Sequence, residues 1–138
     1  MAGKTGQHIF ITDDDQDDIE FLSIALRRAG YTGSIGNFSH GGVLMSHLLQ
    51  HPDALPDMIV MDINMPVKNG CDTLEALMQH NRLRAIPVIM LTSSIRKQDE
   101  MQCYAMGCIG YHSKPSSLAG YSHIAASIMN SLANGWNN

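Results

Sequence analysis

Polar side chains that could do chemistry stand at the ends of several apolar runs in this sequence. They are Asp13 and Asp14, Asp62, Thr92 and Lys114. If the runs are parallel strands of one sheet, their carboxyl ends lie along the same edge, where such sheets place their sites. Two or three carboxylates, one hydroxyl and one ammonium would then converge there.

A convergence of these groups suits phosphoryl chemistry that uses a divalent cation. Clustered carboxylates repel one another, and a shared cation relieves that repulsion. Oxygen ligands with room for water suit Mg²⁺, which typically takes one or two carboxylates plus phosphate oxygens. A carboxylate beside the metal can act as a nucleophile on a phosphoryl group and form an acyl phosphate. The metal and the lysine would offset the phosphoryl charge, and the threonine could donate to a phosphoryl oxygen.

The elements that must position these groups are short strands alternating with helices. Apolar runs without polar alternation suit strands that are buried on both faces, as in a parallel sheet. The runs occupy residues 8–12, 34–39, 58–62, 87–91 and 108–112. Such alternation predicts right-handed crossovers and a doubly wound α/β fold.

Helical spacing of apolar residues fills each interval between the strands. The first helix carries its apolar face from Ile19 to Ala29 and ends at Gly30, a plausible cap. Shorter helices follow, one around 43–48 and one opening near Asp72. Less regular spacing predicts a fourth over about 95–106, stopping at Gly107. The last helix runs to about Leu132, with Ser116 or Ser117 as its N-terminal cap.

Four segments, in order, resemble the motifs of response-regulator receiver domains. "MDINMPVKNG" resembles the phosphoacceptor segment, and "TDDD" resembles the acidic pair after the first strand. "VIMLTSS" resembles the strand with the switch threonine, and "GYHSKP" resembles the fifth strand with its lysine and proline. The resemblance runs from about His8 to about Leu132. It implies a flavodoxin-like fold, a five-stranded parallel sheet in the order 2-1-3-4-5 flanked by five helices.

The resemblance also implies a role for each site residue. Asp62 would be the phosphoacceptor, and Thr92 and Lys114 would bind the phosphoryl group. Mg²⁺ would be held by Asp13, Asp14, Asp62 and the backbone carbonyl of Asn64.

Two further roles concern the fifth strand and the residues after it. Tyr111 would be the switch aromatic that moves inward when Thr92 closes on the phosphoryl group. The bond between Lys114 and Pro115 would be a cis peptide, which costs little before proline.

A receiver of this type would act through protein partners. A sensor histidine kinase or a histidine phosphotransfer protein would donate the phosphoryl group, and water would later hydrolyse the acyl phosphate. The domain would catalyse its own phosphorylation and dephosphorylation, although it is a signalling domain and not a conventional enzyme. Phosphorylation would change its conformation, to control an unknown downstream protein or to relay the phosphoryl group. The face of the fourth helix, fifth strand and fifth helix would bind that protein or form a homodimer.

Length and composition are consistent with this interpretation. The chain has 138 residues, which predicts one domain over 1–138, with a core at about 8–132 and no output domain. A net charge of -4 argues against nucleic-acid binding. No apolar stretch approaches the ~20 residues of a membrane span. Three cysteines without a CxxC pair predict reduced thiols. A cytoplasmic protein is the default expectation.

Two other functions deserve comparison. A phosphatase of the haloacid-dehalogenase type would also use an aspartyl nucleophile, but that family needs a second acid two residues later. Asn64 stands there after Asp62, although Asp13 and Asp15 form a D-x-D pair. The chain is also too short for a cap domain. A scaffold that keeps the fold without phosphorylation is the other alternative, and the complete residue set argues against it.

The remaining acids of the run behind the first strand have simpler interpretations. Asp15 is expected on the solvated surface. Asp17 and Asp18 are expected to favour the dipole at the start of the first helix. The run is not an EF-hand, because Asp18 and Ile24 occupy the positions of its glycine and closing glutamate.

Overall fold

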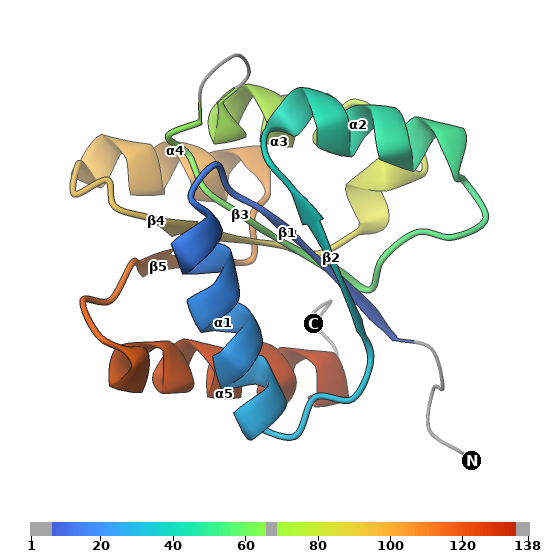
Figure 1. Cartoon of the computed structure of the whole chain (residues 1–138). Helices are drawn as coiled ribbons and strands as arrows, with labels where there is room; N and C mark the ends of the chain where they lie inside the picture. The colour runs from blue at the N-terminus through green and yellow to red at the C-terminus, as the bar shows by residue number, and fades with distance from the viewer. Residues whose placement is uncertain (1–6, 66–68, 135–138) are drawn as a thin grey trace.

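The computed structural model describes residues 7–65 and 69–134, which form five strands and five α-helices (Figure 1). A 3₁₀ turn, η1 (Leu83–Ala85), precedes the fourth strand. The other elements are β1 (His8–Thr12), α1 (Gln16–Arg28), β2 (Ser34–Phe38), α2 (Gly41–Gln50), β3 (Met58–Met61), α3 (Gly70–Met78), β4 (Val88–Thr92), α4 (Lys97–Met106), β5 (Gly110–Ser113) and α5 (Leu118–Asn134).

The strands form one parallel sheet in the order β2-β1-β3-β4-β5, which confirms the predicted fold. Helices α1 and α5 cover one face, and α2, α3 and α4 cover the other (Figure 1). Alternate side chains of the strands therefore enter two separate cores. Ile9 and Val60 belong to the core under α1 and α5, whereas Phe10 and Met61 belong to the other. Burial on both faces explains why the central strands are continuously apolar.

Helix ends follow local rules that the sequence carries. Gly30 and Gly107 have φ angles of +102° and +120°, the left-handed conformation that glycine adopts without strain. Tyr31 N donates to Leu26 O across the first of these ends, which satisfies a carbonyl that the helix leaves free. Ser117, one of the two predicted caps, accepts a hydrogen bond from Gly120 N on its side-chain oxygen at 3.4 Å.

Some boundaries differ from the sequence prediction by about two residues. Helix α3 begins at Gly70, because the Asn69 side chain caps it by accepting from Asp72 N. Helix α4 begins at Lys97 and not at 95. Strand β5 begins at Gly110 and not at 108, because Cys108 still completes the end of α4 by donating its N–H to Cys103 O. Local hydrogen bonds at helix ends set the limits at Gly70 and Gly110, and apolar spacing does not reveal them.

The helices are short on the scale of a lipid bilayer. In the part of the chain that the structure describes, none is both long and apolar enough to span a membrane. The longest, α5, has 17 residues.

Candidate functional site

Backbone hydrogen bonds continue past the strand ends and tie the polar residues to one another. Asp13 N donates to Phe38 O at 2.9 Å, and Asp62 N donates to Thr12 O at 3.0 Å. Lys114 N donates to Thr92 O at 2.9 Å. The sheet itself therefore positions the site, because each residue is fixed by the strand beside it. The predicted convergence of strand ends is present.

A repeated turn directs the side chains at three of these strand ends. In each, a side-chain oxygen accepts a hydrogen bond from the backbone N–H two residues later, as in Asx and Ser/Thr turns. The pairs are Asp13 Oδ1 with Asp15 N at 2.9 Å, Asp62 Oδ1 with Asn64 N at 3.2 Å, and Thr92 Oγ1 with Ser94 N at 3.1 Å. The turn occupies one oxygen of each carboxylate and leaves Oδ2 for the site.

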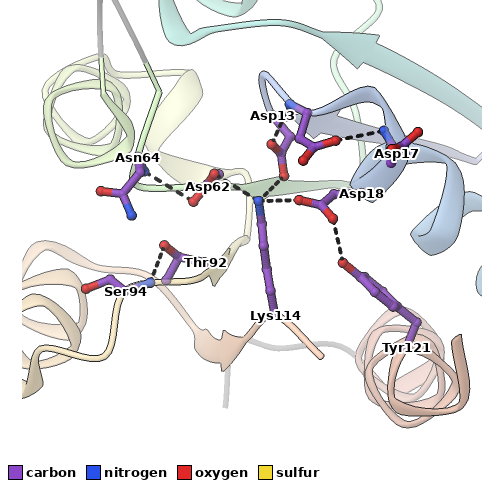
Figure 2. A network of polar contacts seen from close by, with 10 residues as sticks. Asp13, Asp17, Asp18, Asp62, Asn64, Thr92, Ser94, Lys114 and Tyr121 are labelled. Atoms are coloured by element: carbon purple, nitrogen blue, oxygen red, sulfur yellow. Dashed lines mark hydrogen bonds and ion pairs between the residues drawn. The ribbon is translucent and has the colours of Figure 1, made fainter. Parts of the chain in front are cut away.

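The ammonium of Lys114 joins these free oxygens (Figure 2). Its Nζ lies 2.9 Å from Asp13 Oδ2, 3.1 Å from Asp62 Oδ2 and 2.6 Å from Asp18 Oδ2. The lysine side chain is only 12% exposed. Burial alone would lower the pKa of Lys114, but hydrogen bonds to Asp18 and Asp13 and the charges of Asp13 and Asp62 raise it above its usual range. Lys114 is therefore an ammonium at physiological pH.

Three carboxylates at this edge could share one cation. Among the described residues, Asp13, Asp14 and Asp62 are the one group of three or more acids, histidines or cysteines whose ligand atoms all lie within 4.8 Å of each other. Asp13 and Asp62 are buried and Asp14 is exposed, so the trio opens to solvent on one side.

The electrostatics of Asp13 also fit a cation. Burial raises the pKa of Asp13 to about 6, even though Asp15 N–H and Lys114 act in the opposite direction. The positive charge of Lys114 alone therefore does not fully stabilise the ionised carboxylate of Asp13. Hard carboxylate oxygens with an open side are the donor set that Mg²⁺ takes.

Gly70 allows α3 to begin very close to the carboxyl end of β3. A Cβ at this position would lie 2.1 Å from Asp62 O, which is far inside contact distance. Gly70 N also donates to Ile63 O at 2.9 Å. The glycine in the "NG" pair is thus required by the approach of two backbones, and its N–H holds the carbonyl of Ile63.

Thr92 is fully buried at the end of β4, next to β3 in the sheet. The Thr92 oxygen accepts a hydrogen bond from Ser94 N through a lone pair, and this bond does not use the hydroxyl proton. The proton is therefore free to donate elsewhere. Tyr111 packs against the core that lies under α2, α3 and α4. Among the described residues its buried hydroxyl makes no hydrogen bond of ordinary geometry, although the nearby Ser94 side chain acts to lower its pKa. An unpaired buried hydroxyl costs about 1–3 kcal/mol. This cost is compatible with a side chain that has a second position, and the predicted movement stays a prediction.

One predicted feature is wrong. In residues 7–65 and 69–134 every peptide bond is trans, including the bond between Lys114 and Pro115. The cis and trans forms before proline differ by only about 0.5–1 kcal/mol, so a motif does not decide between them. Pro66, the proline of the phosphoacceptor motif, lies outside the described residues.

A polar groove of about 900 Å³ opens beside the residues that follow Asp62. Ile63 and Asn64 form part of one wall, and Ser94, Arg96 and Asp99 form part of another. Asp99 accepts hydrogen bonds from the Ser94 hydroxyl and from the Arg96 guanidinium, at 2.8 Å for Arg96 Nη2. The Arg96 and Ser94 contacts lower the pKa of Asp99. This bonded turn fixes the loop between β4 and α4 beside Thr92.

Sequence reasoning missed three residues around the site. Asp15 is exposed, as expected, but its side chain also caps α1 by accepting from Asp17 N. Asp18 was assigned to the helix start alone, but it contacts Lys114 and also accepts from the Tyr121 hydroxyl at 3.2 Å. Tyr121 lies on the buried face of α5, where the sequence indicates only packing. A buried tyrosine hydroxyl usually finds a partner, and that rule was the one available signal.

Comparison with known proteins agrees with the fold. The model of the response regulator receiver domain matches residues 9–124. The probable methanogenesis regulatory protein FilR2 of Methanothrix harundinacea is 30% identical over 112 residues, 79% of this chain and 72% of that protein. This chain spans only 24–51% of seven further curated relatives.

Solved structures show the same architecture. The phosphorylated cyanobacterial phytochrome response regulator RcpA superposes with a TM-score of 0.85 at 26% identity, covering 94% of this chain and 96% of RcpA. The Mn²⁺-bound form of response regulator Rcp1 gives 0.84 at 22% identity, covering 94% and 96%. The chain therefore belongs to the response regulator receiver domain family of two-component signalling.

Proposed function

We propose that this receiver accepts a phosphoryl group on Asp62 from a histidine of a sensor kinase or of a histidine phosphotransfer protein. The observation that carries the proposal is the position of Asp62. Its carboxylate is 3% exposed, one oxygen is fixed by Asn64 N–H, and the other lies 3.1 Å from Lys114 Nζ. RcpA, a phytochrome response regulator by name, has been crystallised in its phosphorylated form, which supports phosphorylation of this chain.

The chain's own residues supply most of the transfer chemistry. A carboxylate oxygen of Asp62 forms the new O–P bond while the P–N bond to the donor histidine breaks, and the imidazole leaves after taking up a proton. Lys114 and the free hydroxyl proton of Thr92 stabilise the negative charge on the phosphoryl oxygens. Water later attacks the phosphorus, the bond between phosphorus and the Asp62 oxygen breaks, inorganic phosphate leaves, and Asp62 is again a carboxylate.

The proposed cofactor is Mg²⁺, held by Asp13, Asp14, Asp62 and the backbone carbonyl of Asn64. The carboxylate trio and the elevated pKa of Asp13 support this assignment. The relative Rcp1 has been crystallised with Mn²⁺. Bound between these oxygens, the cation would neutralise charge on the phosphoryl group and so lower the barrier to its transfer.

Phosphorylation would shift the protein between two conformations. New contacts of Thr92 and Lys114 with the phosphoryl group favour one of them, and Tyr111 moves with Thr92. Near Tyr111, the surface around α4 exposes three large apolar side chains, Ile95, Met101 and Tyr104, at 93%, 64% and 47%. We assign this α4–β5–α5 face to a downstream protein or to a second copy of the chain. Passing the phosphoryl group onward is the alternative output.

The test uses a small phosphodonor. Wild-type protein is incubated with phosphoramidate or acetyl phosphate, with and without Mg²⁺, and its intact mass is measured. We expect a single Mg²⁺-dependent phosphoryl adduct that is lost in Asp62→Asn. The absence of an adduct, together with failure to bind beryllofluoride, would contradict the proposal and leave a scaffold with the receiver fold.

A further inference from the structure

Lys114 has a partner that the proposed chemistry does not use. Asp18 Oδ2 lies 2.6 Å from its Nζ, a shorter distance than those to Asp13 and Asp62. Asp18 stands in the first turn of α1, and its side chain is 21% exposed. It is not one of the three carboxylates that lie close enough to share a cation. Figure 2 shows it on one side of the ammonium, with Asp62 on the other.

The donor count of an ammonium explains why a third carboxylate matters. Lys114 has three N–H protons, and in the structure three carboxylates lie within 3.1 Å of its Nζ. If Asp13 binds a cation and Asp62 carries a phosphoryl group, both carboxylates change partners. The contact with Asp18 is the one that this chemistry leaves in place.

We propose that Asp18 is a positioning residue that anchors Lys114, so that the ammonium keeps its place at Asp62 before and after phosphoryl transfer. This inference rests on the proposed function of Asp62. Without Asp18, the flexible lysine chain would be held only by Asp13 and Asp62. Its ammonium would then compete with the cation for the same oxygens, and it would be less well placed for the incoming phosphoryl group.

Tyr121 fixes the anchor from the opposite side. Its hydroxyl donates to Asp18 Oδ1 at 3.2 Å, while Lys114 occupies Oδ2. Tyr121 is 1% exposed in the core between α1 and α5. Both oxygens of Asp18 are thus engaged, and the carboxylate cannot rotate away without breaking a contact. The place of the ammonium is therefore set by α1, α5 and the end of β5 together.

A simpler role for Asp18 is a favourable charge near the N-terminus of α1, and the chain offers a matched control for it. Asp17 lies in the same first turn, carries the same charge and is exposed. Asp17→Asn and Asp18→Asn each remove one negative charge from that turn, but only the second removes the contact with Lys114. Tyr121→Phe removes one hydroxyl and leaves the packed ring.

The experiment combines a rate with a spectroscopic signature. The rate of phosphorylation by phosphoramidate is measured over a range of donor concentrations at saturating Mg²⁺, which separates donor affinity from the transfer rate. Nitrogen-15 NMR of lysine ammonium groups, with the Lys114 signal assigned by its loss in Lys114→Arg, reports whether the ammonium is held and protected from exchange.

We expect Asp18→Asn to slow phosphoryl transfer about tenfold, because small misplacements of a charged group are costly in the transition state. In this variant the ammonium protons of Lys114 should exchange quickly with water, and the NMR signal of the ammonium should be lost. Asp17→Asn should keep the signal and react within about twofold of wild type. Tyr121→Phe should fall between them, at about threefold.

Three results would overturn the inference. Asp18→Asn could react at the wild-type rate and keep the signal, or Asp17→Asn and Asp18→Asn could slow equally, which would assign the effect to helix charge. If Asp18→Asn fails to fold, Tyr121→Phe carries the test, and unchanged rate and signal there would overturn it. A wild-type protein that accepts no phosphoryl group refutes the proposed function instead, and the ammonium signals alone then decide whether Asp18 holds Lys114.

Discussion

Replacing Asp13 by asparagine should stabilise the protein when no divalent cation is present. Asp13 is 4% exposed, and burial, opposed by the Asp15 N–H and by Lys114, raises its pKa from 3.8 to about 6. The ionised form is therefore disfavoured in the folded state. Asparagine has nearly the same shape, and its side-chain oxygen can still accept from Asp15 N–H, but it carries no charge.

The size and the pH dependence of this effect follow from the elevated pKa. Each pKa unit is worth ~1.4 kcal/mol, so the ionised Asp13 costs roughly 3 kcal/mol of folding free energy at about pH 8. The folded pKa lies above the unfolded one. Below about pH 4 Asp13 is protonated in both states and this cost is absent, so the protein is at its most stable with respect to this group. The stability is lost as the pH rises through about 6, where the folded Asp13 ionises.

The free energy of unfolding should be measured by urea denaturation in EDTA, at about pH 8 and about pH 5.5. At the higher pH we expect Asp13→Asn to exceed wild type by about 1–3 kcal/mol, with a smaller difference at the lower pH. Asp17→Asn, an exposed acid nearby, is the control and should show no such gain. An Asp13→Asn protein less stable than wild type at about pH 8 would refute this account of the site's electrostatics.

Three further changes test how local structure supports the site. Asp15→Ala removes the cap of α1 and should lower the free energy of unfolding by about 1 kcal/mol, whereas an unchanged urea midpoint would mean that this cap does not stabilise the helix. Gly70→Ala places a Cβ 2.1 Å from Asp62 O, so it should lower the melting temperature and slow phosphorylation together; normal values for both would contradict the close approach. Burial and the charge of His51 lower the pKa of His47, so the folded protein should lose stability as the pH falls below about 6.5. His47→Gln should reduce that loss, measured as the difference between melting temperatures at about pH 7.5 and 5.5. An identical loss in the variant would exclude His47 as its source.

The strand-end residues could be predicted from the sequence because parallel strands impose a simple geometry. Once continuous apolar runs are assigned to a doubly wound sheet, their carboxyl ends must share one edge. Asp13, Asp62 and Lys114 therefore had to meet, and the sheet ladder shows how: their backbone N–H groups bond to neighbouring strands. The helix ends at Gly30 and Gly107 could also be predicted from the sequence, because glycine adopts the left-handed conformation that each of these ends has.

The contacts around Asp18 could not be predicted in the same way. Asp18 and Lys114 are 96 residues apart, and their contact depends on how α1 is oriented over the sheet. A helix pattern in the sequence reports only which face is apolar. The isomer of the Lys114–Pro115 bond is a similar case, because the two forms differ by less than the energy of one or two side-chain contacts. Small energy differences set by tertiary packing lie beyond what residue types and spacing reveal.

The most direct test of the central claim is to identify the phosphorylated residue itself. Borohydride reduces an aspartyl phosphate to homoserine, so protein treated with phosphoramidate and Mg²⁺ can be reduced, digested and mapped by tandem mass spectrometry. The account predicts homoserine at position 62 and at no other aspartate. Homoserine at Asp13 or Asp14, or an unmodified Asp62 in protein that carries a phosphoryl adduct, would contradict it.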